Sequence, residues 1–198
     1  MRPRPKSVKA DPVKQAEFVQ TVRPLLTAPA TDIWFADESG IASDPRPYLI
    51  WAKRGTKPIL PVLAEHWRTS IVGAVRPSDG YFCALSISGG NQWTFQVFLD
   101  ELNRHIDPAK RNLLIMDNAR FHHASALKWG KLEPLFLPPY SPELNPIEEL
   151  WLQMKKNFFY YWLPTDQENL ERRAMEALNY YLDHSRIVKS ITATTGYL

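Results

Sequence analysis

The sequence predicts an α/β domain, in which a mixed β-sheet is covered by helices. Its first half contains short runs with the alternating apolar and polar pattern of half-buried strands. Residues 93–106 instead repeat apolar side chains every three or four positions, as an amphipathic helix does. A short apolar run, LLIM, then ends at Asp117 and is typical of a buried central strand. This order of strands, helix, buried strand and further helices indicates a mixed sheet with helices packed against it.

The N-terminal segment differs from the rest of the chain. Residues 1 to about 12 are rich in Pro, Lys and Arg without periodicity, which predicts a flexible arm or linker. Residues 13–26 place apolar side chains on one face of a short helix, which Pro24 should end. We therefore divide the chain into a basic arm with a short helix, residues 1–30, and a main domain, residues 31–198.

The main domain should begin with strands and end with helices. The predicted strands are residues 32–40, 48–55, 69–75, 81–87, 112–117 and 133–137. The turn signal RPSDG joins the third and fourth of these runs into a hairpin. The predicted helices are residues 93–106, a short one around 123–131, and two C-terminal ones at about 146–160 and 167–184.

Composition narrows the functional classes. The chain of 198 residues is 44% hydrophobic and 23% charged, as expected for an ordinary globular protein. Its single cysteine excludes an internal disulfide and a zinc site built from cysteines, and fits a reducing cytoplasm. No apolar stretch is long enough to span a bilayer, and no apolar segment follows the basic N-terminus as in a secretory signal. The net charge of +3 is compatible with nucleic-acid binding without requiring it.

Two aspartates lie where a reaction centre could form. Asp37 shares a strand face with Ile33 and Phe35, so it should be partly buried and need a cation or hydrogen-bond donors. Asp117 follows the buried strand, and α/β sheets bind ligands at the carboxyl ends of their strands. Each has a local alternative, because Asp37 could cap the following turn and Asp117 could start an Asx turn with Asn118.

The third acidic candidate follows a proline-rich loop, PPYSPELNPIEELW. Helical periodicity places Glu148 at the edge of an apolar stripe, whereas Glu149 should face water. Local geometry favours another role for Glu148, in a capping box with Asn145 as N-cap. Two aspartates and a glutamate brought together would need a divalent cation, and their hard oxygens suit Mg²⁺ or Mn²⁺. A pair of such ions serves phosphoryl transfer.

Three motifs carry a family resemblance: FADESG (residues 35–40), LIMDNARFH (114–122) and LPPYSPELNPIEELW (137–151). In this order they resemble the DDE endonuclease domain of bacterial insertion-sequence transposases in the mariner superfamily. The resemblance implies a ribonuclease H-like five-stranded fold with Asp37, Asp117 and Glu148 as catalytic, metal-binding residues. It also implies cleavage of DNA at transposon ends by metal-activated water, and transfer of the freed 3′-hydroxyl into target DNA.

Such transposases usually carry N-terminal helix-turn-helix domains, whereas about 30 residues precede the first predicted strand here. We therefore expect either the catalytic half of a split transposase, working with a separate DNA-binding half, or a truncated remnant. Pairing of two transposon ends predicts a homodimer on double-stranded DNA.

Other side chains could support this chemistry. Trp51, Lys53, Arg54 and Lys57 could contact nucleic acid, although a solvated hairpin tip explains them equally well. Lys155 lies on the helix edge of Glu148 and could hold a phosphate, and Asn118 could orient a carboxylate by a hydrogen bond. His122 could approach the site, but it is interpreted as a surface histidine in preference. Two other functions stay open, a non-catalytic DNA-binding remnant of a transposase and a ribonuclease H-like nuclease of RNA–DNA hybrids.

Overall fold

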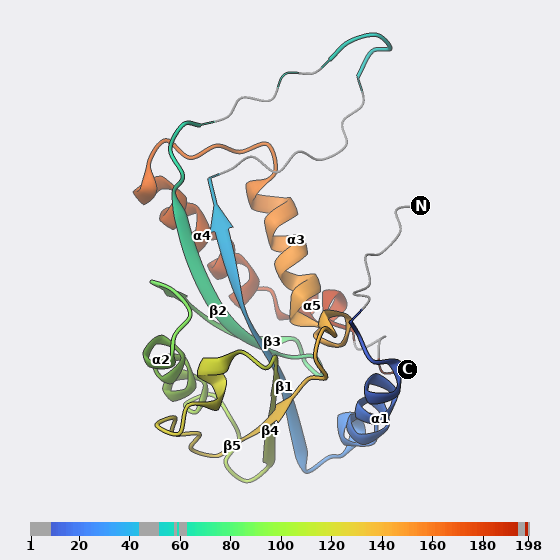
Figure 1. Cartoon of the computed structure of the whole chain (residues 1–198). Helices are drawn as coiled ribbons and strands as arrows, with labels where there is room; N and C mark the ends of the chain where they lie inside the picture. The colour runs from blue at the N-terminus through green and yellow to red at the C-terminus, as the bar shows by residue number, and fades with distance from the viewer. Residues whose placement is uncertain (1–8, 44–51, 58, 60–62, 194–196, 198) are drawn as a thin grey trace.

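A mixed five-stranded sheet forms the centre of the protein (Figure 1). The computed structural model describes residues 9–43, 52–57, 59, 63–193 and 197. The strand order is β3-β2-β1-β4-β5; β1 pairs antiparallel with β2 and parallel with β4. The strands are β1 (Thr31–Ala42), β2 (Arg68–Arg76), β3 (Tyr81–Ile87), β4 (Arg111–Met116) and β5 (Leu132–Phe136). The predicted α/β class, the five strands of the sheet and the β2–β3 hairpin are confirmed.

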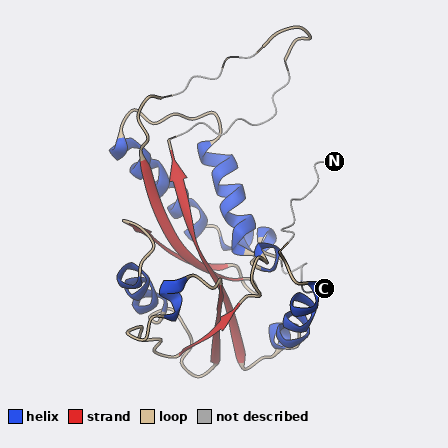
Figure 2. Ribbon diagram, viewed as in Figure 1, coloured by secondary structure: helices blue, strands red, loops and turns tan. Residues whose placement is uncertain are grey.

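Helices cover both faces of this sheet (Figure 2). One face packs against α1, α3, α4 and α5 in a large apolar core, and the other packs against α2 in a second core. The helices are α1 (Pro12–Val22), α2 (Gln92–Leu102), α3 (Ile147–Phe159), α4 (Gln167–Leu182) and α5 (Ser185–Ile191). Within the described part of the chain, none of them combines the length and apolarity that crossing a membrane would require.

Strand β1 separates the two cores by simple alternation. Ile33 and Phe35 belong to the core under α3, whereas Trp34 and Ala36 belong to the core under α2. Asp37 continues the first set, so its carboxylate points toward α3, as the strand period predicts.

Two predicted elements differ from the structure, and one helix was not predicted. Instead of a helix at residues 123–131, a 3-10 turn (Arg120–His123) is followed by turns. There the backbone N–H of Lys128 donates to the side chain of Gln96 on α2, so tertiary bonds replace the helical ladder. In the predicted strand 48–55, residues 48–51 lie outside the described part, and 52–55 run into a turn at Gly55, whose φ is +86°. The last predicted helix, 167–184, is α4, and the helix that follows it, α5, was not predicted.

A glycine on β2 makes room for the helix that covers β1. Gly73 pairs with Asp37 across the sheet. A Cβ atom at Gly73 would lie 2.9 Å from Cη2 of Trp151, 3.0 Å from the ring of Phe82 and 3.1 Å from the carbonyl oxygen of Cys83. The indole of Trp151 can therefore reach Asp37 only because position 73 has no side chain.

We expect Gly73→Ala to lower the free energy of unfolding by about 1–3 kcal/mol, because the added methyl group overpacks the core against backbone and two rings. Chemical denaturation measures this loss. The matched control is Gly40→Ala, since a Cβ atom at Gly40 on β1 meets nothing within 4 Å. Equal stability of the two variants would contradict this account of the Trp151 packing.

Candidate active site

The three predicted carboxylates line one cleft of about 490 Å³. Its wall is formed by the middle of β1, the residues that follow β4, the proline-rich loop and the start of α3. The lining residues are Asp37, Asp117, Asn118, Ala119, Leu137, Pro138, Pro139, Tyr140, Ser141, Pro142, Asn145 and Glu148.

Strand register brings the two aspartates to the same level. The parallel pairing of β1 with β4 includes Phe35 opposite Ile115. Asp37 and Asp117 each lie two residues beyond that pair. Their neighbouring positions therefore follow from the sheet and need no contact between the two side chains.

The proline-rich loop is bonded to the residue that precedes each aspartate. The backbone N–H of Leu137 donates to the carbonyl of Met116 at 2.8 Å. The amide of Asn145, which is buried, donates to the carbonyl of Ala36 at 3.0 Å. The loop and the helix that follows it are thus positioned directly from the two strands that carry Asp37 and Asp117.

Further bonds hold the same loop. Asn118, predicted to orient a carboxylate, instead donates from its amide to the carbonyl of Leu137 at 2.5 Å. The amide of Gln15 on α1 donates to the hydroxyl of Ser141 at 2.8 Å, and the hydroxyl of Tyr197 donates to the carbonyl of Leu144 at 2.7 Å.

Glu148 does not form the capping box that local geometry favoured. The residue before α3 is Pro146, and no side chain caps this helix. Asn145 does not act as the predicted N-cap, because its side-chain oxygen accepts no hydrogen bond from the helix, while its amide nitrogen donates to β1. Burial raises the pKa of Glu148; Lys155 lowers it in part, and Asp117 raises it further. Glu149 is exposed and accepts a bond from Gln153 on its own helix, which confirms that it faces away from the cleft.

Asp37 is the most perturbed carboxyl in the cleft. Its Oδ2 atom accepts a hydrogen bond from the indole N–H of Trp151 at 3.1 Å. Burial raises its pKa to about 8, and the negative charges of Glu148, Glu38 and Asp117 add to this effect. The cleft therefore holds more negative charge than its own cations balance.

His122 is a buried residue, so its interpretation as a surface histidine is wrong. Its side chain is 1% exposed and lies between the rings of Phe95 and Phe121. Nδ1 lies 3.0 Å from Oδ1 of Asp117, and Nε2 lies 3.1 Å from Oε1 of Glu38.

Burial opposes the charged form of this imidazole, but the bonds to the two carboxylates outweigh burial and raise its pKa to about 9. Asp117 responds in the opposite direction, because the bond from His122 outweighs burial and lowers its pKa. Glu38 was not among the predicted site residues. Strand alternation nevertheless indicates that the residue after Asp37 faces the opposite side of the sheet, toward α2.

The predicted basic residues fall into two groups. Lys155 donates to the hydroxyl of Ser39 at 2.6 Å and acts on the charge of Glu148, so it lies beside the cleft as expected. Lys53, Arg54 and Lys57 are exposed in and beside a turn above the upper ends of β1 and β2 (Figure 1), and do not line the cleft. Trp51 lies outside the described residues.

The donor set fits a hard divalent cation, although the side chains are not closed around one. Among the described residues, no group of three or more His, Cys, Asp or Glu side chains has the geometry of a finished metal site. The carboxylates are nevertheless the oxygen ligands that Mg²⁺ and Mn²⁺ prefer. Burial, and after it the neighbouring carboxylates, raise the pKa of Asp37, and a bound cation would oppose both effects.

Comparison with known proteins places this chain in a family. Residues 32–171 match the DDE superfamily endonuclease family. A protein of Sinorhizobium fredii, the uncharacterized protein y4pE/y4sA, is 32% identical over 122 residues, which cover 61% of this chain and 90% of that protein. The IS630 insertion element uncharacterized 39 kDa protein of Shigella sonnei is 28% identical over 127 residues, which cover 60% of this chain and 36% of that protein.

Solved structures share the fold. The catalytic domain of Mos1 mariner transposase superposes with a TM-score of 0.57 at 16% identity, covering 97% of this chain and 94% of that one. The Mos1 strand transfer complex gives 0.65 at 19% identity, and the Mos1 paired end complex with Mn gives 0.66 at 18%; both alignments cover 97% of this chain. The present chain spans 63% and 64% of those two Mos1 chains, and about a third of the IS630 protein. The mixed sheet is thus ribonuclease H-like.

We expect Asp37→Asn to stabilise the metal-free protein at pH 8 by more than about 1 kcal/mol. A carboxyl whose pKa is raised from 3.8 to about 8 on folding takes up a proton, so wild-type stability falls as pH rises through this interval. The asparagine oxygen still accepts the bond from Trp151. Chemical denaturation with a chelator, at pH 4 and pH 8, measures the difference.

The exposed Glu149→Gln is the control and should change stability little at either pH. A difference between wild type and Asp37→Asn that is the same at both pH values would contradict the charge repulsion.

Proposed function

This chain belongs to the DDE superfamily endonucleases, and we propose that it is the catalytic domain of an insertion-sequence transposase. It cleaves DNA strands at transposon ends and joins the freed 3′-hydroxyl to target DNA. The observation that carries this proposal is the meeting of Asp37, Asp117 and Glu148 in one cleft, from two adjacent strands and the helix after the proline-rich loop.

We propose that these three carboxylates hold Mg²⁺, or Mn²⁺ in its place, as a pair of ions. Bound there, the ions would activate the attacking hydroxyl and stabilise the leaving oxygen in phosphoryl transfer. Two of the Mos1 structures that share this fold were solved with Mn and with Mg.

The chain's own side chains prepare the cleft for this chemistry. Trp151 donates to Asp37 and His122 donates to Asp117, so one carboxylate oxygen of each aspartate is held in place by a hydrogen bond. Lys155 places a positive charge beside Glu148, where it reduces the repulsion that the carboxylates exert on a phosphate.

Double-stranded DNA is the proposed partner. Solved relatives of the same fold are a strand transfer complex and paired end complexes. The exposed Lys53, Arg54 and Lys57, with Trp51, are candidates for phosphate and base contacts. Because two transposon ends must be paired, we propose a homodimer in the bacterial cytoplasm, working with a helix-turn-helix DNA-binding half.

Nicking of duplex DNA tests the proposal. With Mg²⁺ or Mn²⁺, Asp117→Asn and Glu148→Gln should lose activity by roughly 100-fold or more, because each removes a charged ligand. Glu149→Gln is the matched control on the neighbouring residue, and it should retain activity.

The proposal would be contradicted by loss of nicking in the control alone, or by unchanged nicking in both cleft variants. Preferential cleavage of an RNA–DNA hybrid would favour a ribonuclease H-like nuclease. A lack of nicking even with a DNA-binding half present would favour a non-catalytic remnant.

The two nitrogens of His122 can be tested separately. In His122→Asn the amide nitrogen replaces Nδ1 and keeps the bond to Asp117, whereas in His122→Gln it replaces Nε2 and keeps only the bond to Glu38. We expect Mn²⁺ affinity to fall by about 10–100-fold in the glutamine variant and much less in the asparagine variant. Isothermal titration with Mn²⁺ measures both. Equal losses would show that His122 acts only through packing.

A further inference from the structure

Tyr140 adopts a backbone conformation that tyrosine rarely takes. Its φ is +59°, in the left-handed region, and its side chain is 54% exposed. It lies in the turn that follows Pro139 and forms part of the cleft wall. A turn residue with positive φ after proline is normally glycine or asparagine, so a bulky ring here costs backbone strain.

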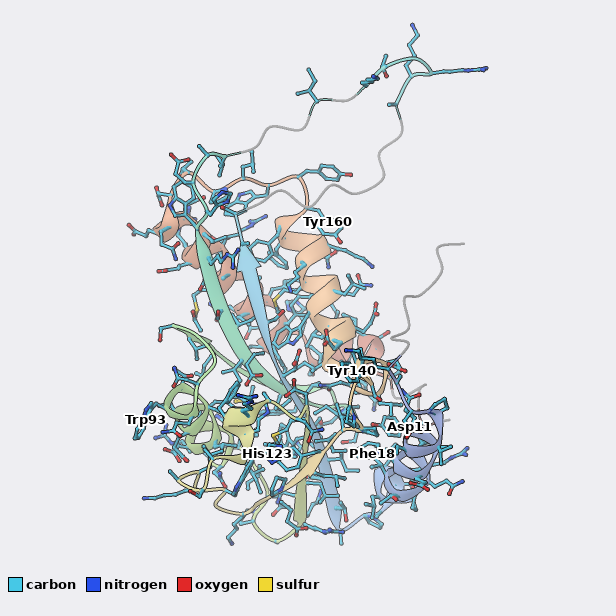
Figure 3. All side chains as sticks on the ribbon, viewed as in Figure 1. Asp11, Phe18, Trp93, His123, Tyr140 and Tyr160 are labelled. Carbon is cyan, nitrogen blue, oxygen red and sulfur yellow. The ribbon has the colours of Figure 1, made fainter. Side chains whose placement is uncertain are left out.

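Fold stability does not explain this ring. Among the described residues, Tyr140 makes no ring–ring contact, and about half of its side chain is open to solvent. The other tyrosine with positive φ, Tyr161, lies just beyond the end of α3 and does not line the cleft. The two lie at opposite ends of α3, as the labels of Tyr140 and Tyr160 show (Figure 3).

Bonds of the neighbouring residue hold the turn that carries Tyr140 in place at the cleft. The next residue, Ser141, is 3% exposed and is bonded to Gln15 and to the carbonyl of Pro139. The ammonium of Lys9 lies 5.6 Å from the centre of the ring. A flat, fixed aromatic face with a cation beside it therefore lies on the wall that also carries the three carboxylates.

We propose that the ring of Tyr140 is a stacking platform for an unpaired nucleobase of the DNA strand that enters the cleft. This inference rests on the proposed function and adds a subsite to it. Base stacking on an aromatic side chain tolerates any base and needs a ring whose face is exposed and whose position is fixed. Because bases inside a duplex have both faces covered, the stacked base must be one that has left the helix. The cation attracts the adjoining phosphate.

The test uses a duplex with a short 3′ overhang, whose first unpaired base is 2-aminopurine, in the presence of Ca²⁺. Wild type and Tyr140→Phe should bind it equally and quench its fluorescence, since both keep the ring. Tyr140→Gly removes the ring but suits the positive φ, so it should fold normally, bind about tenfold more weakly and quench little. Tyr161→Gly relieves the same strain at the far end of α3, and should bind and quench like wild type.

Three results would overturn the inference. They are unchanged binding and quenching by Tyr140→Gly, loss of both in Tyr140→Phe, and no binding of the probe by wild type. Weaker binding that accompanies loss of a dimer on size-exclusion chromatography would also overturn it, because the ring would then be a protein contact. Nicking of plasmid DNA by wild type is measured in parallel. If wild type nicks and Tyr140→Gly retains wild-type binding, only this inference fails and the proposed function stands.

Discussion

Mutual repulsion among carboxylates is the constraint on which this structure depends. Asp37, Asp117 and Glu148 line one cleft with Glu38 close behind. Burial, with the charges of the other three carboxylates added, raises the pKa of Asp37 to about 8. A chain cannot hold such groups together by contacts between them. Their positions must instead be imposed by the backbone on which they lie.

Hydrogen bonds around the proline-rich loop fix these positions. This loop is tied to the residue before each aspartate, through Leu137 to β4 and through Asn145 to β1. Gly73 leaves room for Trp151 to approach Asp37, and the protonated imidazole of His122 lies between Asp117 and Glu38. Sheet, loop and helix thus together hold the negative charges in one place. The strained backbone of Tyr140 belongs to the same loop.

Periodic features of this fold could be predicted from the sequence. Alternation in β1 placed Asp37 on the face under α3, and helical period separated Glu148 from Glu149. Contacts between distant segments could not be predicted. His122 and Glu38 are 84 residues apart and carry no local signature of their pairing. The capping box is absent because the side chain of Asn145 is directed to β1 by its amide nitrogen and its oxygen accepts no bond from α3. The helix at 123–131 is absent because the side chain of Gln96 accepts a backbone N–H there.

The most direct test of the shared metal site is a crystal grown with Mn²⁺, examined by its anomalous scattering. The account predicts a strong peak in the cleft, about 2.1 Å from carboxylate oxygens of both Asp37 and Asp117, with Glu148 coordinating it or a second ion. It also predicts that Trp151 and His122 keep their bonds to the two aspartates. A saturating Mn²⁺ concentration that gives no peak in the cleft, or a peak held by other side chains, would contradict the claim that these three carboxylates form one site.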